Sequence, residues 1–194
     1  LSLMLTPDFS DFPVLTTPRL VLRQMRLSDA ATLMHFRSAP ELNVFSIREP
    51  ATSITAMEEL IKRMLESERN GEGVHWALEL GDKPGVMIGD IGIWKIIREH
   101  HRGVLGYVLK KEHQGKGLMA EALHAVVHYG FNDLQLHSLM AEVNPQNNAS
   151  FELLERLGFR REGLFREDVY FRGAFHDTAV YSLLKTDFSD KNWG

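Results

Sequence analysis

The sequence predicts an α/β fold: one domain with a mixed sheet and helices on both of its faces. Strand-like segments, in which apolar residues alternate with polar ones or run together, are interleaved with segments whose apolar residues recur every three or four positions. That succession favours helices packed against a central sheet. The 194 residues, 44% of them hydrophobic and 25% charged, are enough for one domain with a substantial core.

The first half of the chain begins with a strand and two helices. Leu20 and Leu22 alternate with Arg19 and Arg23, which predicts a strand with one face in water. Apolar residues at helical spacing then predict an amphipathic helix that ends at an Asn-Gly pair. The elements predicted for this half are a strand over 17–25, helices over 28–37 and 53–69, and strands over 75–80, 86–97 and 103–109.

The second half alternates helix and strand before it closes on two strands. A glycine ends the second of these helices, and an Arg-Gly turn joins the last two strands. The predicted elements are a helix over 117–131, a strand over 138–143, a helix over 149–157, and strands over 161–171 and 175–185.

Composition excludes several classes of function. The net charge is -4 and no block of basic residues is present, which argues against general nucleic-acid binding. The absence of cysteine excludes disulfides, a cysteine nucleophile and thiolate metal sites, and fits a reducing compartment, the cytoplasm. No apolar run reaches the roughly 18 residues of a membrane span, and the first residues lack the basic region of a signal peptide.

Two glycines, Gly115 and Gly117, flank Lys116 at the start of a predicted helix. The free amides and positive dipole end of a helix start bind phosphates, and glycine lets a diphosphate approach the backbone. A loop that needs positive φ angles explains the glycines equally well. A P-loop requires Ser or Thr after the lysine, and a dinucleotide-binding turn requires a β-α-β unit, whereas three successive strands come first here.

This segment is similar to motif A of the GCN5-related N-acetyltransferase (GNAT) family, Gln/Arg-x-x-Gly-x-Gly/Ala. Gln114, Gly117 and Met119 fall on its defined positions, with Met119 in place of a small residue. Residues 144–159, with Asn-Pro-Gln-Asn-Asn-Ala-Ser followed by Leu-Leu-Glu-Arg-Leu-Gly-Phe, resemble the next block of the family. The stretches 17–23 (Thr-Pro-Arg-Leu-Val-Leu-Arg) and 173–184 resemble its branch of ribosomal-protein N-terminal acetyltransferases.

The resemblance implies an acyl-CoA N-acyltransferase domain over residues 15–187, between an N-terminal extension (1–14) and a C-terminal tail (188–194). Its sheet would have six to seven mostly antiparallel strands, splayed between 103–109 and 138–143, with acetyl-CoA as cosubstrate in the gap and no metal. The cofactor contacts implied are the backbone of Tyr107, Val108 and Leu109 for the pantetheine, the amides of Gln114, Gly115, Lys116, Gly117, Leu118 and Met119 for the diphosphate, and the side chains of Asn144 and Asn147.

The implied reaction is direct attack of an amine on the thioester, which needs a base and a hydrogen-bond donor for the departing thiolate. Asp90 and Glu79 are the candidate bases, since each interrupts an apolar strand, although each can equally be the wet member of an alternating strand. By resemblance Ser150 faces the CoA sulfur; its place in a first helical turn also suits capping. Tyr170 is a second candidate acid. The backbone N–H of Val108 or Leu109 would stabilise the oxyanion.

The acceptor implied by the branch is a protein N-terminus. The alternatives are a small amine, such as a polyamine, amino acid or antibiotic, and a non-catalytic acyl-CoA-binding module. Residues 40–73 would line the acceptor side, and the last two strands could form a homodimer interface. Glu121, His124 and His128 share a helix face, but the pair lacks the internal glutamate of His-Glu-x-x-His, so a solvated face is favoured over a metal site.

Overall fold

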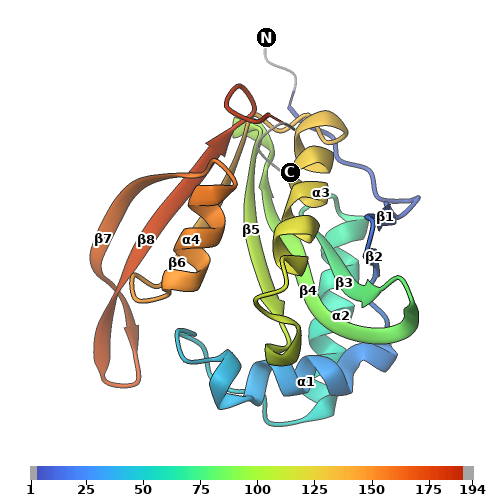
Figure 1. The fold of residues 1–194 in the computed structure, drawn as a ribbon, viewed down its shortest axis with the longest axis horizontal. Coiled ribbons are helices and arrows are strands. Elements are labelled where there is room, and N and C mark those ends of the chain that lie inside the picture. The colour runs from blue at the N-terminus through green and yellow to red at the C-terminus, as the bar shows by residue number, and fades with distance from the viewer. Residues whose placement is uncertain (1–3, 190–194) are drawn as a thin grey trace.

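A single eight-stranded sheet runs through the molecule in the computed structural model, which describes residues 4–189 (Figure 1). Its strands lie in the order β1-β2-β3-β4-β5-β6-β8-β7. All neighbouring strands are antiparallel except β5 and β6. The strands are β1 (Leu15–Thr16), β2 (Leu20–Gln24), β3 (Val74–Leu80), β4 (Lys83–Ile97), β5 (Arg102–Leu109), β6 (Ser138–Val143), β7 (Arg160–Phe171) and β8 (Ala174–Leu184).

Two pairs of helices cover the two faces of the sheet. The helices are α1 (Ala30–Ser38), α2 (Ile54–Arg69), α3 (Leu118–Asn132) and α4 (Asn148–Arg156). The apolar stripes of α3 and α4 pack on the face that carries Trp76 and Ile91, and form the larger core. Helices α1 and α2 pack on the opposite face, against Ala77 and Met87. In Figure 1, α3 and α4 lie on the near side of the sheet and α2 lies behind it.

The predicted fold is confirmed, with small differences at element ends. All seven predicted strands and all four helices are present, and the short strand β1 is an addition. Strand β4 begins at Lys83, three residues before its predicted start, because Lys83 pairs with Leu80 of β3 across a tight turn. Strand β2 begins at Leu20 rather than at residue 17, since Thr17 turns back to donate its N–H to the Leu20 carbonyl.

The sheet splits where the sequence predicts. Strands β5 and β6 pair in parallel from Arg102 with Ser138 to Leu105 with Ala141, and no further. Beyond that point β5 continues to Leu109 without a partner on this side. The strands β6, β8 and β7 therefore form a wing that diverges from the rest of the sheet, as Figure 1 shows.

The segment before β1 packs on the domain. Phe9 is buried in the larger core, and the Trp76 indole N–H donates to the Pro13 carbonyl at 2.7 Å. Near the other end, Phe188 packs on Phe131 of α3. Residues 1–3 of the expected N-terminal extension and 190–194 of the expected tail lie outside the described residues. Within residues 4–189, no helix combines the length and apolar composition that a membrane crossing requires.

Candidate functional site

A cavity of about 830 Å³ occupies the space where β5 and β6 diverge. One wall consists of the end of β5, the glycine turn and the start of α3, and the opposite wall of the end of β6 and α4. Residues between Glu41 and Arg48, in the loop after α1, close it from the other face of the sheet. The cavity is therefore lined from both faces of the split sheet.

The glycine turn presents bare backbone to this cavity. Gly115 and Gly117 have φ angles of +71° and +76°, so both explanations of the glycines hold together: the turn needs left-handed backbone, and it lines the cavity. A Cβ built on Gly115 would meet nothing within 4 Å. Gly117 is the N-cap of α3 and supplies no side-chain cap, which leaves the first amides of the helix available to an anion.

Two side chains fix the turn in place. The Gln114 side-chain amide donates to the Leu109 carbonyl at 2.8 Å, which ties the turn to the end of β5. The Arg19 guanidinium donates to the Lys116 carbonyl at 2.9 Å and pairs with Glu121 at 2.7 Å. Leu118 and Met119 are buried in the larger core and also line the cavity, whereas Lys116 does not line it.

The free edge of β5 directs alternate backbone groups into the gap. The Lys110 N–H donates to Ile88 of β4 at 2.9 Å, and Val108 pairs with Asp90 of β4 two residues earlier. Because backbone groups alternate along a strand, those of Val108 face β4, whereas those of Tyr107 and Leu109 face the open side. The expected pairing role of Val108 is therefore not supported by its orientation, and Leu109 is the better placed of the two expected oxyanion donors.

Helix α4 brings its first turn to the cavity. Asn147 is the N-cap, and its side-chain oxygen accepts from the Ser150 N–H at 3.2 Å, while Asn144 likewise accepts from Gln146 at 2.9 Å. Ser150 also lines the cavity and lies near the buried Tyr107 hydroxyl. Burial raises the pKa of Tyr107 to about 12, against a smaller opposing effect of Ser150. No hydrogen bond of standard geometry reaches the Tyr107 hydroxyl from the described residues.

Asp90 lies on β4, the strand that pairs with the cavity-lining end of β5. It is 8% exposed, pairs in register with Val108, which lines the cavity, and has one carboxylate oxygen without a hydrogen bond from the described residues. Burial raises the pKa of Asp90, and the charges of Arg37 and Arg48 oppose that rise. Arg48 itself lines the cavity. A buried carboxyl whose pKa is raised suits a base that works near neutral pH.

Glu79 and Tyr170 are not brought to the cavity. Glu79 forms a buried ion pair with Arg23 and also accepts from the Gly85 N–H at 3.1 Å. Tyr170 is 65% exposed on the β7–β8 hairpin, where its ring packs on Phe175. Glu79 is enclosed in an ion-pair cluster and Tyr170 lies on open surface, so neither is placed for acid or base chemistry at this cavity.

Several charged side chains at or beside the cavity were not singled out by sequence reasoning, among them Glu142, Arg37 and Arg48. Glu142 lines the cavity and alternates along β6 with Ala141 and Val143, which face the larger core, so it faces the side of α1 and α2. The sequence signal that could have pointed to Glu142 is its charge within the otherwise largely apolar strand Ser138–Val143. Arg37 and Arg48 carry no comparable pattern. Of the expected acceptor segment, residues 40–73, only the part between Glu41 and Arg48 lines the cavity.

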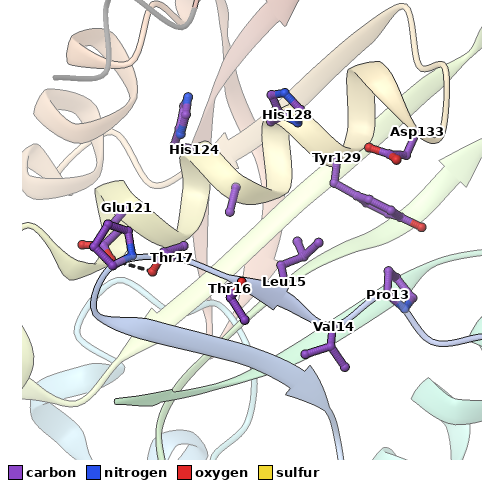
Figure 2. Close-up of a pocket in the computed structure, with 12 residues that line it drawn as sticks. Pro13, Val14, Leu15, Thr16, Thr17, Glu121, His124, His128, Tyr129 and Asp133 are labelled. Carbon is purple, nitrogen blue, oxygen red and sulfur yellow. Dashed lines mark hydrogen bonds between the residues drawn. The ribbon is translucent and has the colours of Figure 1, made fainter. Parts of the chain in front are cut away.

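A second cavity of about 530 Å³ lies on the outer side of α3, against residues 13–18 (Figure 2). Glu121 reaches across it to the Thr17 hydroxyl. His124 and His128 lie side by side with ring centroids 6.5 Å apart. The structure shows, over residues 4–189, no group of three side chains that could hold a metal ion.

Comparisons with known proteins agree with this geometry. The Acetyltransferase (GNAT) domain family matches residues 19–160. An uncharacterized N-acetyltransferase, p20, of Bacillus licheniformis is 33% identical, over 90% of this chain and 98% of that protein. The [ribosomal protein uS5]-alanine N-acetyltransferase of Escherichia coli is 29% identical, over 90% and 92%. The fold matches spermidine N-acetyltransferase of Vibrio cholerae in complex with CoA and spermine (TM-score 0.78, 23% identity, 88% and 98% covered).

Proposed function

The chain belongs to the GNAT family of N-acetyltransferases, and from this we propose that it transfers the acetyl group of acetyl-CoA directly to the N-terminal amine of a protein. The observation that carries the proposal is the cavity through the split sheet. A cofactor on the side of α3 and α4 and an acceptor on the side of α1 and α2 can meet there without a covalent enzyme intermediate.

The residues present fit acetyl-CoA. The uncapped amides of Gly117, Leu118 and Met119, at the positive end of α3, would hold its diphosphate. The outward backbone groups of Tyr107 would pair with the pantetheine amides as a further strand would, which leaves the Leu109 N–H for the thioester carbonyl. When bound, the cofactor supplies a thioester carbonyl as the acetyl donor.

The chain supplies the proton transfers. Glu142 attracts the acceptor ammonium. Asp90 takes the proton of that ammonium through a water, because Asp90 lies behind the wall that Val108 and Arg48 form. The Leu109 N–H stabilises negative charge on the carbonyl oxygen. The Ser150 hydroxyl donates a hydrogen bond to the departing sulfur.

The ribosomal-protein relative supports a protein N-terminus as the acceptor. The solved polyamine enzyme shares the fold, so a small amine is the competing acceptor. A non-catalytic module would bind acetyl-CoA and acetylate neither. The three possibilities are separated by turnover assays with neutral peptides, peptides that carry an acidic residue, and spermidine.

Thermal unfolding with and without acetyl-CoA tests the cofactor site. At about 100 times its Kd the ligand should add about 2.7 kcal/mol to the free energy of unfolding. Gly115→Asp should abolish the shift, because a carboxylate would occupy the space for the diphosphate. Gly173→Asp is the matched control: Gly173 also has a positive φ, +82°, and open space, but lies in the β7–β8 turn. No shift in the unchanged protein would overturn the proposal.

A further inference from the structure

Two arginines act on Asp90 from the side of α1: one lines the cavity and the other does not. Arg48 comes from the loop after α1 and lines the cavity. Arg37, in the last turn of α1, has a buried Nε that no acceptor among the described residues reaches. Both lie close enough to Asp90 for their charges to lower its pKa, and Arg37 also acts on Arg48. Partial burial of the guanidinium, and then the charge of Arg37, lower the pKa of Arg48 to about 10.

Neither arginine is held by an ion pair in the described part of the chain. Both guanidinium groups act on the Asp90 carboxyl, yet neither forms an ion pair with any residue from 4 to 189, and the carboxylates of Glu41 and Glu142 that also line the cavity do not pair with them. Elsewhere in the protein a buried arginine is fully paired: Arg23 bonds to both Asp29 and Glu79. Arg48 is exposed where it lines the cavity, and Arg37 is half-buried with an Nε that lacks a hydrogen bond. Guanidinium groups bind carboxylates through paired hydrogen bonds, so an anion that enters the cavity would be bound favourably here.

We propose that the acceptor carries a carboxylate within its first residues, and that Arg48, with Arg37 behind it, binds that carboxylate. This inference rests on the proposed transfer to a protein N-terminus and specifies which N-termini are preferred. Glu142 lines the same cavity and can face the α-ammonium. An acceptor with an ammonium and a nearby carboxylate therefore complements the site, whereas a polyamine would place further positive charge beside two arginines.

The test uses hexapeptides whose other side chains are uncharged, with glutamate or glutamine placed in turn at the first, second or third position. Free glutamate and free glutamine are assayed as a further pair. They show whether the preferred acceptor is a peptide with a side-chain carboxylate or a free amino acid. A charge-assisted hydrogen bond predicts a kcat/KM roughly ten- to a hundredfold higher for one glutamate peptide than for its glutamine partner.

Arg48→Gln and Arg37→Gln should each reduce that ratio toward one. Both arginines also act on Asp90, but a change in the pKa of the base alters turnover of the glutamate and glutamine peptides alike, so the ratio isolates the contact with the carboxylate. Arg63→Gln, at an exposed position of α2, should leave the ratio as it is. Should Arg48→Gln fail to fold, Arg48→Lys serves, because lysine keeps the charge but loses the two-pronged geometry and should reduce the ratio.

The outcomes separate the two proposals. Acetylation of peptides with equal kcat/KM for every glutamate and glutamine pair overturns the carboxylate inference and leaves the proposed function standing. A preference that Arg48→Gln does not change also overturns it. Acetylation of spermidine alone, or of no acceptor while acetyl-CoA still raises the Tm, overturns the proposed protein acceptor itself.

Discussion

Two buried acidic regions on neighbouring strands of the same sheet differ in how their charges are paired. On β3, Glu79 shares the Arg23 guanidinium with Asp29, two carboxylates around one cation, all three at most 6% exposed. On β4, Asp90 faces two arginines and pairs with neither at ion-pair distance.

The difference separates a structural role from a functional one. The Glu79 cluster is closed: Arg23 joins β2 to β3 and to the 3₁₀ turn that precedes α1, and each of its three guanidinium nitrogens donates a hydrogen bond. The Asp90 group lies beside a cavity, with an oxygen and a guanidinium nitrogen unsatisfied. Buried polar groups without partners are rare in folded proteins, and they mark the place where a ligand or water is expected.

The largest effect is expected in the closed cluster. Arg23→Gln leaves Asp29 and Glu79 buried without a counter-charge, so the free energy of unfolding should fall by about 3–5 kcal/mol. Urea denaturation measures it, with Arg63→Gln as the exposed control. The acetyl-CoA affinity of the folded fraction should not change. A loss below about 1 kcal/mol would mean that the cluster is open to solvent.

Asp90→Asn should lower activity while it raises thermal stability. Removal of the base should lower kcat about a hundredfold or more. Burial raises the pKa of Asp90 above its unfolded value, so the folded state binds the proton more tightly and the ionised carboxylate destabilises it at higher pH. The variant should therefore have a higher Tm at neutral pH, and the gain should vanish below the unfolded pKa.

The pH profile of the same reaction gives an independent check. Activity requires ionised Asp90, so its acid limb should lie above the ordinary aspartate range. Arg48→Gln removes a charge that lowers the pKa of Asp90 and should shift this limb to higher pH. If Asp90→Asn leaves the acid limb in place, Glu142 becomes the candidate base. Glu142→Gln would then confirm that role by lowering kcat rather than raising KM.

The sequence predicted the glycine-turn side of the cavity better than the side of α1 and α2. Gly115 and Gly117 could be recognised because a left-handed backbone selects glycine, and the split of the sheet was implied by the family resemblance. Asp90 and Glu79 look alike in sequence, as single acids in apolar strands, and only their partners distinguish them. Arg37 and Arg48 come from a helix end and an irregular loop, and only tertiary folding brings them to Asp90.

The smallest effect is expected at an exposed ion pair next to Arg48. Glu49 pairs with Arg172 of the β7–β8 hairpin at 2.8 Å, with both side chains more than half exposed. Solvent screens such pairs, so Glu49→Gln should leave the Tm unchanged. Any effect should be a modest rise in the KM of the acceptor, since the pair links the loop that carries Arg48 to the hairpin. A clear drop in Tm would show that this contact, unlike other exposed pairs, holds the acceptor wall in place.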